Sequence, residues 1–127
     1  MIVLWKRLKL LEVKRDSNQT RMDLYAVLIP IFLSRELFKN NRDIKEVTDK
    51  LRMKTSIKDY LYDSRTALIA RIIREIQGNT EEDLEYNVEV FKEISLNILE
   101  QKEIVNTSEV TRIINKYSRN NKGEPNE

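Results

Sequence analysis

The sequence contains neither cysteine nor histidine. These absences exclude disulfide bonds, zinc sites built from cysteine and histidine, cysteine nucleophiles, and catalytic triads that use a histidine base. The only two glycines, Gly78 and Gly123, lie far apart, which excludes the glycine-rich loops that bind nucleotide phosphates. The remaining residue types favour a protein that is not an enzyme and that holds no metal ion or other cofactor.

Glycine and proline are also scarce, with two of each among 127 residues. So few turn-forming residues disfavour a β-sandwich or β-barrel and favour helices joined by polar loops. A chain of this length with 40% hydrophobic residues can bury the core of one domain. We predict an all-α fold, a single-domain bundle of five to six helices.

The longest helical pattern covers residues 56–77 and predicts a long central helix. Ser56 and Asp59 match a capping box at its start, and Gly78 follows its end as a candidate left-handed C-cap. Between them, apolar residues recur at three- and four-residue steps, as on one face of an amphipathic helix. These residues include Ile57, Leu61, Leu68, Ile72 and Ile76.

Three arginines of this helix are candidate functional or structural residues. Arg65 falls within the apolar face, where an unpaired charge is costly to bury, so we expect a buried structural charge with an acidic partner. Arg71 and Arg74 lie near two alanines on another face. The small alanines would let another helix or a phosphate approach between the two guanidinium groups.

Residues 1–20 form a basic amphipathic segment whose order the composition does not decide. Its apolar residues share one helical face, and its lysines and Arg7 lie elsewhere. Such a helix can close a bundle, or it can bind a membrane surface. A short strand at residues 2–5 is an alternative. The apolar face comprises Met1, Leu4, Trp5, Leu8 and Leu11.

Residues 22–39 read as an apolar core element, because every residue from 24 to 33 is apolar. That run is about half the length of a bilayer-spanning helix, so no integral membrane insertion is expected. Pro30 predicts a kink near residues 27–29 or a new helix that begins at Pro30. A helix at 42–52 and a short link at 53–55 then give the outline of a helix-turn-helix, which ordinary helical hairpins share.

The sequence after Gly78 predicts a helix from residue 81 to about residue 102, a break at residues 106–108 and a short helix at residues 109–117. Residues 118–127 contain no apolar residue and are expected to be disordered, which leaves 21–117 as the helical domain. The pairs Glu82/Glu85 and Glu100/Glu103 resemble the acidic pairs that bind Mg²⁺ in all-α nucleotide pyrophosphohydrolases. The resemblance implies a carboxylate- and Mg²⁺-dependent nucleotide hydrolase as a remote alternative, although one helix would hold the two pairs about 27 Å apart.

Charge is distributed unevenly along the chain. Residues 1–77 hold 17 Lys and Arg against 10 Asp and Glu, whereas residues 78–127 hold 6 against 11. A basic half indicates an anionic partner such as DNA or RNA, unless the two halves neutralise each other in the fold. The tentative nucleic-acid-binding residues are Arg52, Lys54, Lys58, Arg71 and Arg74.

These patterns favour a small, non-catalytic helical interaction protein. It would associate with nucleic acid through a basic face of its N-terminal half and act as a regulatory or accessory subunit. The alternative is a protein–protein adaptor, or a homodimeric or larger homo-oligomeric structural subunit, without nucleic-acid contact. The N-terminal charges follow apolar residues instead of preceding them, unlike a secretory signal, so a cytoplasmic location is expected.

Overall fold

A computed structural model describes the backbone of residues 2–121 and the side chains of residues 2–102. The described backbone contains helices and no strand, which confirms the predicted all-α class. The elements in chain order are α1 (Ile2–Leu10), α2 (Ser17–Leu33), the 3₁₀ turn η1 (Asn41–Ile44), α3 (Lys45–Thr48), the 3₁₀ turn η2 (Asp59–Asp63), α4 (Arg65–Gln77) and α5 (Glu81–Asn121).

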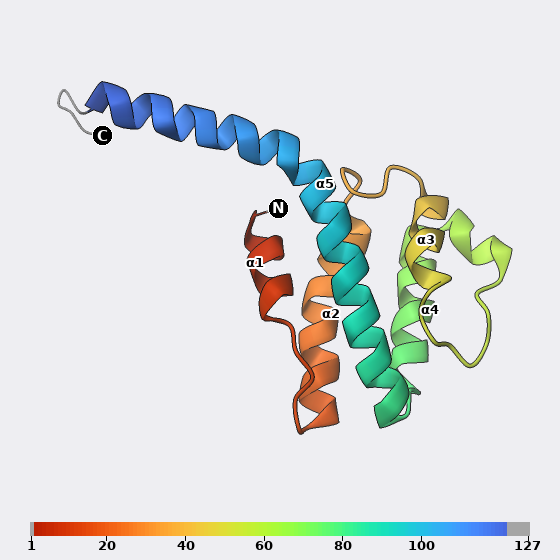
Figure 1. Cartoon of the computed structure of the whole chain (residues 1–127). Coiled ribbons are helices and arrows are strands. Elements are labelled where there is room, and N and C mark those ends of the chain that lie inside the picture. Colours follow the sequence, from red (N-terminus) through yellow and green to blue (C-terminus); the bar gives the residue numbers. More distant parts are fainter. Residues whose placement is uncertain (1, 122–127) are drawn as a thin grey trace.

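Three helices, α2, α4 and α5, form the centre of the bundle, with α1 on one flank and α3 on the other (Figure 1). Their apolar faces meet in a core where the Phe32 ring packs edge-on against the rings of Phe38 and Phe91, each at 5.6 Å between centroids. Burial of this apolar surface is the main stabilising contribution. Fully buried aliphatic residues from the three helices include Leu24, Leu28, Leu68, Ile72, Leu84 and Val88.

Helix α1 lies on the bundle through the face that its sequence predicts. Leu8 is buried, and Leu4 and Trp5 are partly buried against the core. The Trp5 indole N–H donates to Glu100 Oε2 at 3.3 Å, and Lys92 Nζ donates to the Leu11 carbonyl at 2.7 Å just after the helix ends. The strand considered for residues 2–5 is therefore wrong.

Helix α2 begins earlier and ends earlier than the predicted 22–39 element. The Asp16 carboxylate caps it by accepting from the Asn18 amide at 2.9 Å. Pro30 lies inside the helix, so no new helix begins there, and α2 ends at Leu33, within a turn of the proline. Proline lacks the amide needed for the helical ladder, which is consistent with an end soon after it.

The predicted helix at 56–77 begins nine residues too early, since α4 starts at Arg65. Its N-cap is Ser64, whose hydroxyl accepts from the Ala67 amide at 3.3 Å. The preceding residues form η2 instead, because Tyr62 is buried there and its hydroxyl pairs with Thr48 Oγ1 at 2.8 Å. Gly78 has φ of −88°, so the predicted left-handed C-cap is also wrong.

Helix α3 is much shorter than the predicted 42–52 helix. A 3₁₀ turn, η1, replaces its first turn, and α3 ends at Thr48. Residues 49–64 then separate α3 from α4, so the predicted three-residue link is wrong. The chain does not form the helix-turn-helix outline that this link suggested.

The longest helix is α5, with 41 residues and a length of about 60 Å. It continues through the predicted break at 106–108, so the separate helix at 109–117 is wrong. Its first half runs through the bundle, and its second half changes direction and projects away from the other helices (Figure 1). Of the tail expected to be disordered from residue 118 on, residues 118–121 belong to α5, so that part of the prediction is wrong, and residues 122–127 lie outside the described residues. No described helix is long and apolar enough to cross a membrane.

Candidate interaction surfaces

Arg65 is buried, with 6% of its surface exposed, but its partners are not carboxylates. Its Nε donates to Asn41 Oδ1 at 2.8 Å, and its two terminal nitrogens donate to backbone carbonyls. Among the side chains that the structure describes, it forms no ion pair, so the expected acidic partner is wrong. The accepting carbonyls are those of Phe32 at 3.1 Å, Ser34 at 3.3 Å and Phe38 at 2.5 Å.

The Phe32 carbonyl lies in the last turn of α2, where a helix leaves its carbonyls without amide partners. The Ser34 and Phe38 carbonyls follow the helix, and that of Ser34 also accepts from the Phe38 amide at 2.9 Å. The negative end of the helix dipole favours a cation at the same place. Burial, followed by repulsion from Arg35, lowers the pKa of Arg65, whereas Asp43 opposes this shift. Arg65 therefore acts as a structural cap on α2 and is not available to a ligand.

Arg52 lies against the acidic start of α5. Its Nη1 is 3.5 Å from Asp83 Oδ1 and 3.9 Å from Glu82 Oε2, and its guanidinium carbon is 3.8 Å from the centre of the Tyr86 ring. About half of the side chain is exposed, so these pairs are weak individually. They nevertheless neutralise the charge that was expected to contact a nucleic acid.

The backbone of Arg52 is held by a buried amide of α5. Asn87 Oδ1 accepts from the Arg52 amide at 2.7 Å, and Asn87 Nδ2 donates to the Arg52 carbonyl at 3.0 Å. The same Nδ2 donates to Asn79 Oδ1 at 2.8 Å. This polar cluster joins the segment after α3 to α5 and to the turn between α4 and α5.

Arg71 is also paired, within α4 itself. Its Nη2 is 3.1 Å from Glu75 Oε2, four residues further along the helix. The other oxygen of Glu75 accepts from the Lys54 amide at 3.0 Å, so the carboxylate links Arg71 to the segment before η2. Arg71 therefore contributes little net positive charge to the surface.

Lys54, Lys58 and Arg74 differ from Arg52 and Arg71. All three are exposed, and they form no ion pair with the described side chains. The backbone contact of Lys54 with Glu75 places Lys54 beside the turn of α4 that carries Arg74. Among the described side chains, three of the five predicted cations therefore have no ion-pair partner.

The carboxylate face of α5 is exposed, as a solvated helix face would be. Glu82, Glu85, Glu89 and Glu93 are all exposed, whereas Leu84, Val88 and Phe91 face the core. Among the described side chains, no three acidic residues converge as a metal site requires. Glu103 of the second predicted pair has a side chain outside the described residues.

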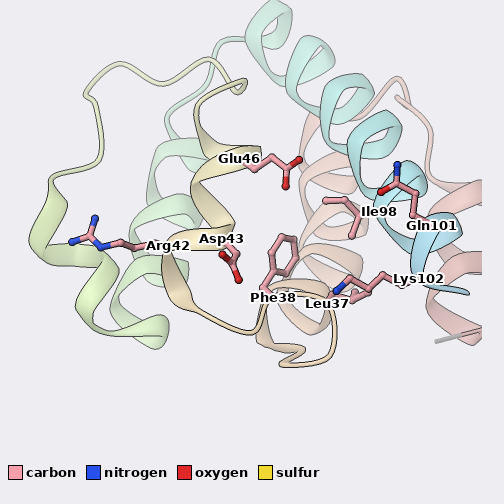
Figure 2. Close-up of a pocket in the computed structure, with 8 residues that line it drawn as sticks. All are labelled: Leu37, Phe38, Arg42, Asp43, Glu46, Ile98, Gln101 and Lys102. Atoms are coloured by element: carbon pink, nitrogen blue, oxygen red, sulfur yellow. The ribbon is translucent and has the colours of Figure 1, made fainter.

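A groove with a volume of about 460 Å³ opens where α5 leaves the bundle (Figure 2). Leu37 and Phe38 contribute buried apolar side chains, and charges of both signs surround them. The carboxylates lie on η1 and α3, and α5 contributes a lysine and an amide. The other lining residues are Arg42, Asp43, Glu46, Ile98, Gln101 and Lys102.

The sequence and the structure were compared with known proteins. No family model, curated protein or solved structure matches this chain.

Sequence patterns did not reveal the polar contacts that join the helices. Arg21 of α2 donates through Nη2 to the Asn79 carbonyl at 2.8 Å and through Nε to the Ile76 carbonyl at 3.2 Å, at the end of α4. Asn87 interrupts the apolar face of α5, and this interruption is the one signal that could have marked it as a buried polar residue.

Proposed function

We propose that this protein is a non-catalytic helical interaction protein that binds a partner protein through the distal part of α5, residues 103–121. The observation that supports this proposal is the continuation of α5 beyond the bundle, where the helix projects away from α1 to α4 (Figure 1). A projecting helix is a common means by which one protein contacts another.

The sequence of this projection supports the proposal. Val110, Ile113, Ile114 and Tyr117 keep the spacing i, i+3, i+4, i+7, which places them on one face of the helix. Tertiary packing of an apolar face supplies most helical stability in proteins. Contact with a partner's groove or helix would supply that packing.

The test compares two aspartate substitutions on opposite faces of the projection. Ile113→Asp places a charge on the apolar face, and Asn115→Asp places the same charge on the other side of the helix. Affinity capture with the full chain should recover the same partner with wild type and Asn115→Asp and lose it with Ile113→Asp. Recovery of that partner at wild-type levels with Ile113→Asp would contradict the proposal.

Nucleic-acid association is a second candidate function, supported by the exposed cations Lys54, Lys58 and Arg74, which pair with no carboxylate among the side chains of residues 2–102. Phosphate contacts would make binding weaken steeply with salt. Fluorescence anisotropy with a labelled duplex and a labelled single strand, at about 50 and about 200 mM salt, measures this effect. The triple alanine variant should lose binding, whereas Arg71→Ala, whose charge Glu75 already neutralises, should retain it. Absence of binding at the lower salt concentration would exclude this candidate.

A further inference from the structure

Helix α1 is apolar on two sides, although only one side packs on the bundle. Ile2, Val3 and Leu10 are 46%, 63% and 79% exposed, whereas Leu8 is fully buried. Among the described residues, three of the seven exposed large apolar side chains lie on this nine-residue helix. Exposed apolar side chains that cluster on one surface indicate an interaction site, so the outer face of α1 is a candidate binding surface.

Positive charges accompany this outer face. At about 100° per residue, Lys6 lies between Ile2 and Leu10 on the side opposite Leu8. Arg7 and Lys9 flank the face, and all three cationic side chains are exposed. Helix α1 carries no acidic residue. The outer face, defined as Ile2, Val3, Lys6 and Leu10, therefore combines exposed apolar groups with unopposed positive charge on its own helix.

Four kinds of partner can be compared for this combination: a second α1, the acidic face of α5 in a second copy, a nucleic acid and an anionic lipid bilayer. The bilayer fits best. A second copy of α1 would bring its lysines and arginine close to those of the first, and like charges repel. The acidic face of α5 in a second copy would offer carboxylates but little apolar surface. Nucleic-acid phosphates would pair with the cations but would not bury Val3 and Leu10. The surface of an anionic bilayer supplies both acyl chains and phosphate groups.

We propose that the outer face of α1 binds the surface of an anionic lipid bilayer. The helix lies along the interface, Val3 and Leu10 enter the boundary between headgroups and acyl chains, and Lys6, Arg7 and Lys9 contact lipid phosphates. Leu4 and Leu8 stay packed on the bundle, so binding does not require the domain to unfold. The membrane is contacted and not crossed, in agreement with the absence of a spanning helix among the described residues.

The single tryptophan provides a direct reporter of this contact. Trp5 is half-buried at the edge between the inner face and Lys9, whose ammonium lies 4.4 Å from the ring centre. Indole side chains favour the membrane interface. Insertion of the neighbouring outer face would move this ring into a less polar medium and shift its emission to shorter wavelength.

The experiment adds vesicles of phosphatidylcholine, with or without phosphatidylserine, to the full chain and measures co-sedimentation and Trp5 emission. Binding and a blue shift are expected only with phosphatidylserine. Leu10→Glu should weaken binding by about tenfold or more. Leu33→Glu, which changes another exposed leucine on α2, is the matched control and should bind as wild type does.

Two outcomes would overturn the inference. One is no binding to phosphatidylserine vesicles at low salt. The other is wild-type binding by Leu10→Glu together with loss by Lys6→Glu, which would indicate electrostatic attraction without insertion. The inference is independent of the proposed docking of α5, because Ile113→Asp should leave vesicle binding unchanged. Urea unfolding of each variant verifies that the bundle is intact.

Discussion

A buried arginine without a carboxylate partner is stabilised here by carbonyl groups. Arg65 reaches from the first turn of α4 to the end of α2, where its guanidinium satisfies acceptors that the chain itself leaves open. Its Nε donates to the Asn41 side chain. The cost of burying the charge is thus offset by several charge-assisted hydrogen bonds.

Replacing Arg65 should therefore destabilise the fold whichever apolar residue is introduced. Both Arg65→Leu and Arg65→Ala remove the donors and leave buried carbonyls unsatisfied, so we expect a loss of about 3 kcal/mol in the free energy of unfolding. Urea denaturation measures the loss. Arg74→Ala, an exposed change on the same helix, should stay within about 0.5 kcal/mol of wild type. Wild-type stability of Arg65→Leu would mean that the carbonyls find other donors.

At the scale of the elements, the choice between two serines decides where α4 begins. Ser56 has the stronger local signal because Asp59 completes a capping box, whereas Ser64 lacks an acidic residue at the matching position. The helix nevertheless starts at Ser64. The deciding contact is long-range, since burial of Tyr62 against Thr48 draws residues 59–63 into a separate 3₁₀ turn. No local pattern contains that information.

Alanine substitutions of Ser56 and Ser64 test which serine caps α4. Ser64→Ala removes the hydroxyl that accepts from the Ala67 amide, and loss of such a cap typically costs about 1 kcal/mol. Ser56→Ala should cost almost nothing, because Ser56 is exposed in the segment before η2. Thermal unfolding of the two variants distinguishes them. Equal destabilisation by both would contradict the observed start of α4.

For α5 the sequence-based prediction was wrong in the opposite way, because it placed a break at residues 106–108 where the helix is continuous. Asn106, Thr107 and Ser108 are only modest helix formers, each less favourable than alanine by at most about 0.7 kcal/mol. Without a glycine or proline among them, they do not end a helix. Before the predicted break, Leu84, Val88 and Phe91 face the core as their spacing predicted, because periodicity depends on local sequence alone.

At the scale of the whole molecule, the basic and acidic halves meet at the junction of Arg52 with α5. The sequence predicted the excess charge in each half and left open whether the halves neutralise each other. Pairing of Arg52 with Glu82 and Asp83 neutralises part of it. Pair formation depends on how α3 and α5 pack, so the surface charges that stay free could not be read from composition.

Asn87 tests how firmly this junction is held. Asn87→Ala would leave the amide and carbonyl of Arg52 without their partners, and an unsatisfied buried group costs about 1–3 kcal/mol. We expect a loss of about 2 kcal/mol, measured by urea denaturation. Asn97→Ala, an exposed change on the same helix, is the control. A loss no greater than that of the control would indicate that water replaces the asparagine amide.

The contact of Arg65 with the end of α2 also has a consequence for the order of folding. The last carbonyls of α2 depend on a side chain more than thirty positions later in the chain, so that end of the helix is completed only when α4 docks. The end of α2 and the start of α4 should therefore open and close as one cooperative unit. Amide hydrogens in the two segments should exchange with solvent at the same free energy of opening, although η1, α3 and η2 separate them in sequence.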